Sequence, residues 1–197
     1  MDKQKPNVYV RIPYIRPLIE SSMLVAIAYI LSWIAIFQLP SGGKITVLSM
    51  LPILLIGIRH GGDWGLGSAL VYSCLQIFQS GGLYAPIYPT PTTYAISALL
   101  DYILAFSVLG LSAVFRSRKY GLFYASLMCL TLRFLCHFVS GVFIWSEVPG
   151  NIDAWKVSLT YNGAYMGVEL LETSAVAYIL CKTAPMLLKP QTVREKT

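Results

Sequence analysis

Five ionisable side chains interrupt long apolar stretches of the sequence: Asp101, Arg133, His137, Glu169 and Glu172. A charged group inside a membrane-spanning helix costs about 2.5 to 3.5 kcal/mol on insertion scales, so it usually has a function or a partner. Carboxylates and an imidazole can hold a polar ligand or move protons, and a guanidinium can neutralise a buried carboxylate. These residues therefore predict a polar site inside an apolar protein.

The composition indicates a membrane protein. Of the 197 residues, 56% are hydrophobic and 12% are charged, whereas a soluble domain carries about 25% charged residues. The net charge of +6 does not gather on one soluble face, so we expect no nucleic acid partner. We expect the chain to lie in a lipid bilayer.

Turn-rich breaks divide the apolar sequence into six candidate spans. The predicted fold is an all-α membrane protein, a bundle of six transmembrane helices with shaped outer loops. The second and third spans are short against the roughly 20 residues that a perpendicular helix needs, so one or both are either partly re-entrant or extended by flanking polar turns. The expected spans are residues 19–39, 45–58, 65–78, 94–115, 122–145 and 159–181.

Basic residues set the expected orientation. If the N-terminus is cytoplasmic, all lysines and arginines fall on the cytoplasmic side except Lys44, Lys156 and Arg133, as the positive-inside rule requires. We expect an N-terminal cytoplasmic or interfacial arm, a transmembrane domain and a cytoplasmic tail. Their expected bounds are residues 1–18, 19–184 and 185–197.

The rise of about 1.5 Å per residue places the ionisable groups in two layers, measured from the expected outer ends of the last three spans. The upper layer, roughly 12 Å deep, holds Asp101, His137 and Glu169. The lower layer, roughly 16 to 18 Å deep, holds Arg133 and Glu172. We expect Arg133 to pair with Glu172, or with Glu169.

The upper layer favours a ligand site that opens outward, because an acid, an imidazole and an amide at one level exceed what packing requires. Helical spacing puts Arg133 and His137 on one face of the fifth span, and Asn162, Tyr165 and Glu169 on one face of the sixth. The lower layer is equally consistent with a structural ion pair that touches no ligand.

Other chemistry is less well supported. His137 is a weak metal ligand because the second histidine, His60, lies at the opposite membrane face, and no nucleophile elbow surrounds Ser140 or Cys136. The sequence lacks a GxxxxGK[ST] motif, so the chain does not hydrolyse ATP by itself. We expect no metal, no cofactor and no enzymatic activity.

Two further functions stay open on the residues alone. An intramembrane enzyme could use His137 with Glu169 as acid and base. A proton or ion pathway could use all five ionisable groups, although none continues inward below the lower layer.

Aromatic and small residues complete the pattern. Trp145 and Tyr161 lie near the expected outer interface, where a bilayer belt or stacking on a cationic ligand would each account for them. Ser22 and Ala26 are four residues apart in the first span, a spacing that lets another helix approach closely; ordinary packing within the bundle accounts for it equally well.

Two motifs in order resemble a known family. The pattern HFxSGxxxW at residues 137–145, followed by YNG at residues 161–163, resembles the thiamine-specific substrate-binding component (S component) of energy-coupling factor transporters. Shorter stretches such as PILLIGIRHG extend the resemblance over most of the chain. The resemblance implies a six-helix protein of the bacterial cell membrane that captures thiamine with high affinity near the outer surface. It also implies a membrane scaffold protein and two cytoplasmic ATPases as partners.

The resemblance implies roles for individual residues. Asp101 would face the aminopyrimidine of thiamine beside the ring of Tyr102, and Trp145 would be the stacking platform. The small face of span one, Ser22 and Ala26, would meet the scaffold protein. A different vitamin or a thiamine precursor is the alternative ligand. The predicted ligand site is Asp101, Tyr102, Arg133, His137, Trp145, Tyr161, Asn162 and Glu169.

Overall fold

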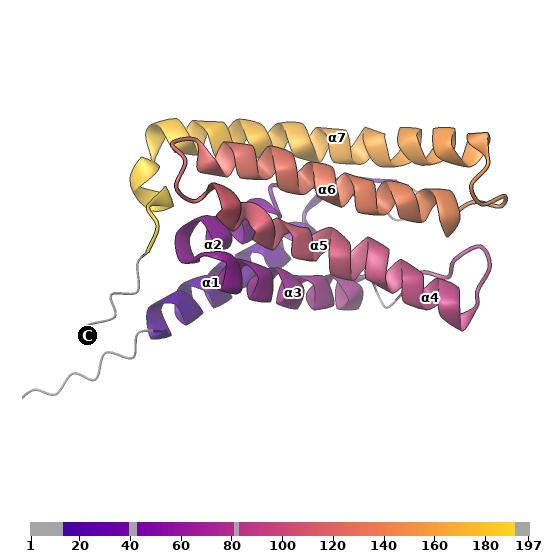
Figure 1. The fold of residues 1–197 in the computed structure, drawn as a ribbon, viewed down its shortest axis with the longest axis horizontal. Helices are drawn as coiled ribbons and strands as arrows, with labels where there is room; N and C mark the ends of the chain where they lie inside the picture. The colour runs from indigo at the N-terminus through magenta and orange to yellow at the C-terminus, as the bar shows by residue number, and fades with distance from the viewer. Residues whose placement is uncertain (1–13, 40–42, 81–82, 192–197) are drawn as a thin grey trace, which may run out of the picture.

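The computed structural model describes residues 14–39, 43–80 and 83–191. Six helical segments run roughly along one long axis, and both described ends of the chain lie at the same end of the bundle (Figure 1). The opposite end is called the far end below. The segments are α1 (Ile15–Trp33), α2 (Leu51–His60), α3 (Gly62–Gln79), a continuous fourth segment through α4 (Pro91–Ser97), η1 (Ala98–Leu104), α5 (Ala105–Ser107) and η2 (Val108–Phe115), then α6 (Gly121–Phe143) and α7 (Ile152–Thr183), followed by the short η3 (Pro185–Leu188).

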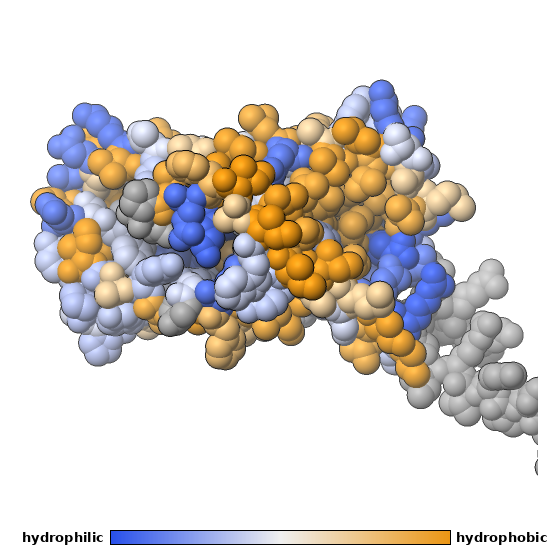
Figure 2. All heavy atoms as spheres, turned by 180° about the vertical axis from the view of Figure 1, so that it is seen from behind, coloured by the Kyte–Doolittle hydropathy of each residue, from blue (hydrophilic) through white to orange (hydrophobic). Residues whose placement is uncertain are grey.

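Four of the described helical segments are long and apolar enough to cross a membrane: α1, the fourth segment, α6 and α7. Large apolar side chains such as Ile30, Val114 and Leu171 point away from the bundle and are exposed. Figure 2 shows hydrophobic side chains across the middle of one face, with hydrophilic side chains gathered toward the ends. The predicted all-α membrane bundle is confirmed.

The short helix α2 forms the centre of the bundle. It has 10 residues, which is about 15 Å of helix and too short to cross a bilayer alone. Its side chains Ile53, Leu54 and Ile56 are fully buried because α1, α3, η2 and α6 all pack around it. A helix that is apolar on every side needs such surroundings.

An antiparallel hairpin, β1 (Ala35–Gln38) and β2 (Lys44–Thr46), connects α1 to α2. The expected helices over 19–39 and 45–58 are therefore wrong at these residues. Two β-branched isoleucines favour extended backbone here: Ile34 precedes the first strand and Ile36 lies within it. The hairpin leads directly into the short helix α2.

The fourth segment begins three residues earlier than expected and is not uniform. Thr90 and Thr93 form a capping box around Pro91 at its start. The part that carries Asp101 and Tyr102 is π-helical, a widened form that often occurs at functional sites. This irregular turn presents Asp101 toward α6, while the hydroxyl of Tyr102 reaches Ser80 at the end of α3.

Helix α7 also begins earlier than expected. Its first turn is capped by Asn151, whose Oδ1 accepts the backbone N–H of Ala154 at 2.6 Å, and the helix extends over 32 residues. The expected start near residue 159 is wrong, because the Asn151 cap lets the helix begin at Ile152. Glu169 lies beside Arg133, about one helical turn below His137 and its predicted layer.

The expected terminal segments fall largely outside the described residues, which begin at Tyr14 and end at Gln191. Helix α1 already begins at Ile15. The last described residue, Gln191, donates its N–H to the carbonyl of Arg59 at 2.7 Å, so the described C-terminal segment packs against the end of α2.

Close helix contacts depend on glycine at a few positions. A Cβ at Gly110 in η2 would lie 2.6 Å from the backbone of Gly65 and Leu66 in α3. Real Cβ atoms do not approach backbone so closely, so α3 and η2 can meet only because this residue has no side chain.

We expect Gly110→Ala to destabilise the protein by about 3 kcal/mol, because overpacking forces the two backbones apart. The measurement is the thermal unfolding midpoint in detergent. Gly167→Ala in α7 is the matched control, because a Cβ there meets nothing within 4 Å. Equal midpoints for the two variants would contradict the close approach.

Candidate ligand-binding site

A cavity of about 550 Å³ lies among α3, the π-helical segment, α6, α7 and the hairpin. Its volume is within the range of about 300 to 1,000 Å³ typical of small-molecule sites. All eight residues of the predicted ligand site line it: Asp101, Tyr102, Arg133, His137, Trp145, Tyr161, Asn162 and Glu169. Ligand contact by each of them stays a prediction.

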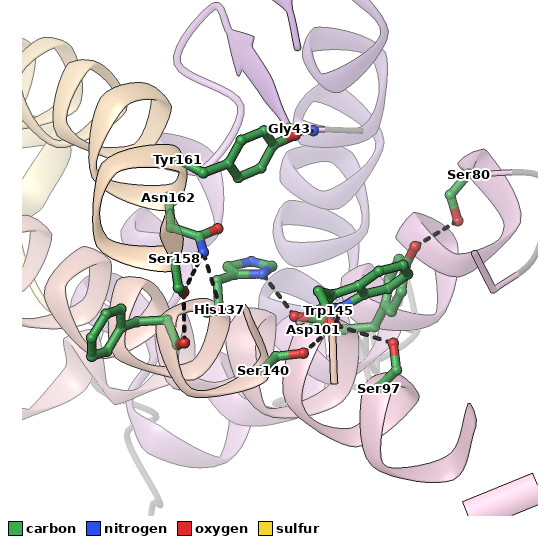
Figure 3. Close-up of polar contacts among 12 residues, drawn as sticks. Gly43, Ser80, Ser97, Asp101, His137, Ser140, Trp145, Ser158, Tyr161 and Asn162 are labelled. Atoms are coloured by element: carbon green, nitrogen blue, oxygen red, sulfur yellow. Dashed lines mark hydrogen bonds and ion pairs between the residues drawn. The ribbon is translucent and has the colours of Figure 1, made fainter. Parts of the chain in front are cut away.

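Asp101 is the centre of the polar contacts near the far end (Figure 3). Its Oδ1 lies 3.1 Å from Nδ1 of His137. Its Oδ2 accepts from the indole Nε1 of Trp145 at 2.9 Å, from Ser140 Oγ at 2.7 Å and from Ser97 Oγ at 3.1 Å. One carboxylate thus joins the π-helical segment to α6 and to the residues that follow it.

Asn162 plays the same part on the α7 side. Its Nδ2 donates to the carbonyl of His137 at 3.3 Å and to Ser158 Oγ at 3.1 Å. Its Oδ1 accepts from the hydroxyl of Tyr165 at 3.1 Å. The amide therefore fixes α7 against the turn of α6 that carries the histidine.

Helices α6 and α7 approach closely at this level because of Gly141. A Cβ there would lie 2.2 Å from Ser158 Oγ and 3.0 Å from Asn162 Nδ2. The glycine of the HFxSG pattern thus makes room for the α7 side chains that line the cavity.

The hairpin packs over the α7 side of the cavity. The hydroxyl of Tyr161 accepts the backbone N–H of Gly43 at 3.0 Å, and a Cβ at Gly43 would lie 2.9 Å from the ring of Tyr165. Tyr102 faces these residues from the opposite side and donates its hydroxyl to Ser80 at 3.1 Å.

A buried ion pair lies deeper in the same cavity. Nη1 of Arg133 donates to Oε2 of Glu169 at 2.8 Å, and its guanidinium lies 4.7 Å above the ring of Phe106. The other carboxylate oxygen accepts the backbone N–H and the hydroxyl of Thr46 at 3.1 and 2.9 Å. The prediction that Arg133 pairs with one of two glutamates is confirmed for Glu169.

The expected two layers are wrong for the glutamates. Glu169 belongs with Arg133 and not with the Asp101–His137 pair, because α7 begins earlier than expected. Glu172 accepts the backbone N–H of Leu48 at 3.2 Å instead of pairing with the arginine.

Several residues that line the cavity were not predicted from the sequence. Gln76 and Gln79 are two amides one turn apart in an apolar helix, a signal that could have been noticed. Ser49 and Met50 follow the hairpin, in a stretch that the sequence predicts as helix. The further lining side chains include Lys44, Tyr72, Tyr84, Phe106 and Tyr165.

The charges of the cavity are largely satisfied within the protein. The carboxylates of Asp101 and Glu169 each have a basic partner, while Lys44 has no ion-pair partner among the described residues. Aromatic rings make up much of the remaining wall. No group of three or more His, Cys, Asp or Glu in the described chain could hold a metal ion.

The two predicted partner-interface residues lie elsewhere. Ser22 and Ala26 line an open groove of about 730 Å³ between α1 and α3, together with Leu18, Asp63 and Trp64. The groove is on the outside of the bundle, so the small residues are accessible to another protein or to lipid.

Comparison with known proteins identifies the family. The thiamine transporter protein family (Thia_YuaJ) matches residues 18–189 of this chain. The chain belongs to the thiamine transporter family. The thiamine transporter ThiT of Bacillus subtilis (strain 168) is 34% identical over 188 residues, which are 87% of this chain and 93% of that protein. A solved structure of ThiT from Listeria monocytogenes superposes with a TM-score of 0.69 at 27% identity, covering 89% of this chain and 98% of that chain.

The resemblance drawn from two short motifs is therefore confirmed. In this thiamine transporter family member the motifs lie on facing walls of one cavity, HFxSGxxxW on α6 and the residues after it, and YNG on α7. Their order in the sequence reflects two antiparallel helices that pack side by side along their length (Figure 1).

We expect Arg133→Met to destabilise the protein by about 3 to 5 kcal/mol, because it leaves the carboxylate of Glu169 buried without its cation. Adding Glu169→Gln to this variant should recover most of the loss, since the amide oxygen can still accept from Thr46. Thermal unfolding midpoints in detergent provide the measurement. Arg118→Met, at an exposed position, is the control. A double variant no more stable than Arg133→Met would show that the ion pair is not the cause.

Proposed function

We propose that this chain binds thiamine with high affinity and takes it up as the S component of an energy-coupling factor transporter. The observation that carries the proposal is the cavity in which an acid, an imidazole and an indole converge, Asp101, His137 and Trp145, in a member of the thiamine transporter family. The site suits capture, and transport would return the ligand chemically unchanged.

The chemistry of thiamine matches the walls of the cavity. The aminopyrimidine carries N–H donors and ring-nitrogen acceptors, which suit the carboxylate of Asp101 and the polar groups around His137. The thiazolium cation suits aromatic faces, because an aromatic ring attracts a cation above its plane. Tyr84, Tyr102 and Trp145 supply such faces on the cavity wall.

The proposed transport needs partners, because the sequence has no ATP-binding motif. The groove between α1 and α3 suits a helix of the membrane scaffold protein, since Ser22 and Ala26 let a partner backbone approach. Asp63 lies in the same groove and would attract a basic residue of that helix. Two cytoplasmic ATPases would complete the transporter.

The proposed location is the bacterial cell membrane, with both termini in the cytoplasm. The basic residues support this orientation: Arg16, Arg59, Arg116 and Lys182 lie toward the end of the bundle that carries the described termini, as the positive-inside rule requires. The far end, with the cavity, would then face outward. We propose residues 19–184 as the transmembrane domain.

We expect purified protein to bind thiamine at micromolar or lower concentration, with quenching of tryptophan fluorescence as Trp145 stacks on the ligand. Asp101→Ala and His137→Ala should each weaken binding by about 2 kcal/mol or more, because each removes a charge-assisted contact and leaves a buried partner. Isothermal titration calorimetry gives the affinities, and mass spectrometry of the released ligand checks that it is unchanged.

Asp153→Ala is the matched control for this experiment, since Asp153 is exposed and its ion pair with Lys156 spans 3.5 Å at the surface. Its affinity should equal that of the wild type. Absence of thiamine binding by the wild type would overturn the proposed function. A competition panel of thiamine precursors and other ring-bearing vitamins identifies the preferred ligand.

We expect Ala26→Leu to abolish thiamine uptake by cells that carry the whole transporter, while the purified variant still binds thiamine. The larger side chain fills the groove that the scaffold helix would occupy. Ile27→Phe adds bulk at the next position, which is exposed but does not line the groove, and should leave uptake intact. Equal uptake by both variants would remove this groove from the partner interface.

A further inference from the structure

Two buried serines contact Asp101 from outside the cavity. Ser97, on α4, and Ser140, on α6, both donate to Oδ2 of Asp101, at 3.1 and 2.7 Å. Their exposed fractions are 1% and 0%, and neither lines the cavity. They therefore touch the carboxylate but not the space that a ligand would fill (Figure 3).

The donors are distributed unequally over the carboxylate of Asp101. Oδ2 receives three donors, the two serine hydroxyls and the indole N–H of Trp145. Oδ1 receives one, from His137. A carboxylate offers about four lone-pair sites in all, so Oδ2 is fully occupied and Oδ1 has a free site. A ligand donor can bind this carboxylate only at Oδ1 unless an internal bond breaks.

The same contacts fix the position of Trp145. Helix α6 ends at Phe143, so Trp145 lies just beyond the regular backbone. Its backbone N–H donates to the carbonyl of Ser140 at 3.3 Å, and its indole N–H donates to Asp101, to which the Ser140 hydroxyl also donates. Ser140 thus restrains Trp145 directly through the backbone and indirectly through the carboxylate.

We infer that Ser97 and Ser140 are positioning residues for ligand recognition: they orient Asp101 so that Oδ1 faces the cavity while Oδ2 anchors the indole of Trp145. This role rests on the proposed thiamine site, and it belongs to two residues that do not line the cavity. It limits Asp101 to a single ligand contact. It also makes the ring of Trp145 a fixed platform before any ligand arrives, which lowers the entropy cost of binding.

The test uses Ser140→Ala and Ser97→Ala in full-length protein labelled with 5-fluorotryptophan. The chain has 4 tryptophans, and the ¹⁹F resonance of Trp145 is assigned by its loss in Trp145→Phe. Each serine variant should shift and broaden that resonance in ligand-free protein and leave the other resonances unchanged. Each should also weaken thiamine binding about tenfold, the effect of one hydrogen bond to a charged group.

Ser126→Ala is the matched control. Ser126 is on the same helix, is also fully buried and also loses a bond to another helix, to Ser174 Oγ at 3.1 Å. It is remote from the cavity, so neither the Trp145 resonance nor the affinity should change. If Ser140→Ala does not fold, the Trp145 resonance and the affinity of Ser97→Ala, on a different helix, test the positioning role.

An unchanged Trp145 resonance in a folded serine variant would overturn the inference. So would a Ser126→Ala variant that shifts this resonance equally. Failure of the proposed function is separate: a wild type that does not bind thiamine, with Trp145 still shifted by both serine variants, would refute thiamine binding and support the positioning role.

Discussion

The ion pair between Arg133 and Glu169 connects the parts of this protein that must stay in register. Both side chains are almost fully buried, where an unpaired charge would be costly. The arginine belongs to α6, while the glutamate belongs to α7 and also holds Thr46 at the end of the hairpin. Three of the elements that line the cavity, α6, α7 and the hairpin, are joined by these contacts, so the geometry of the site depends on this pair remaining closed.

Two departures from regular helix and one glycine shape the site above the pair. The π-helical turn presents Asp101, the end of α6 at Phe143 frees Trp145 to fold toward it, and Gly141 lets α7 come close enough for Asn162 to reach the carbonyl of His137. Each departure puts a polar group where a regular bundle would have an apolar contact. The ligand site is therefore a property of helix irregularities as much as of residue types.

The sequence predicted the helical bundle and the residues around the cavity, because charged groups in apolar spans and the HFxSGxxxW pattern are strong signals. The sequence-based prediction was wrong where the surrounding structure, rather than local helix preference, sets the backbone conformation. The first strand was predicted as helix because Ala35, Ile36 and Phe37 continue the apolar run of the first span. The shortness of the second span was predicted from its length, but the hairpin before it was not. The late start assigned to α7 put Glu169 in the wrong layer, and the Asn151 cap was the signal that would have corrected it.

Helix α2 has a further consequence. Its fully buried side chains pack against η2 and α6 between the Arg133–Glu169 pair and the end that carries the described termini. In the described part of the bundle the cavity is thus closed at its base by tightly packed side chains, and it resembles a cup more than a channel. A solute bound in such a cavity leaves through the same opening by which it entered. For a transport protein this means that the rim itself, rather than the interior, has to be presented to each side of the membrane in turn.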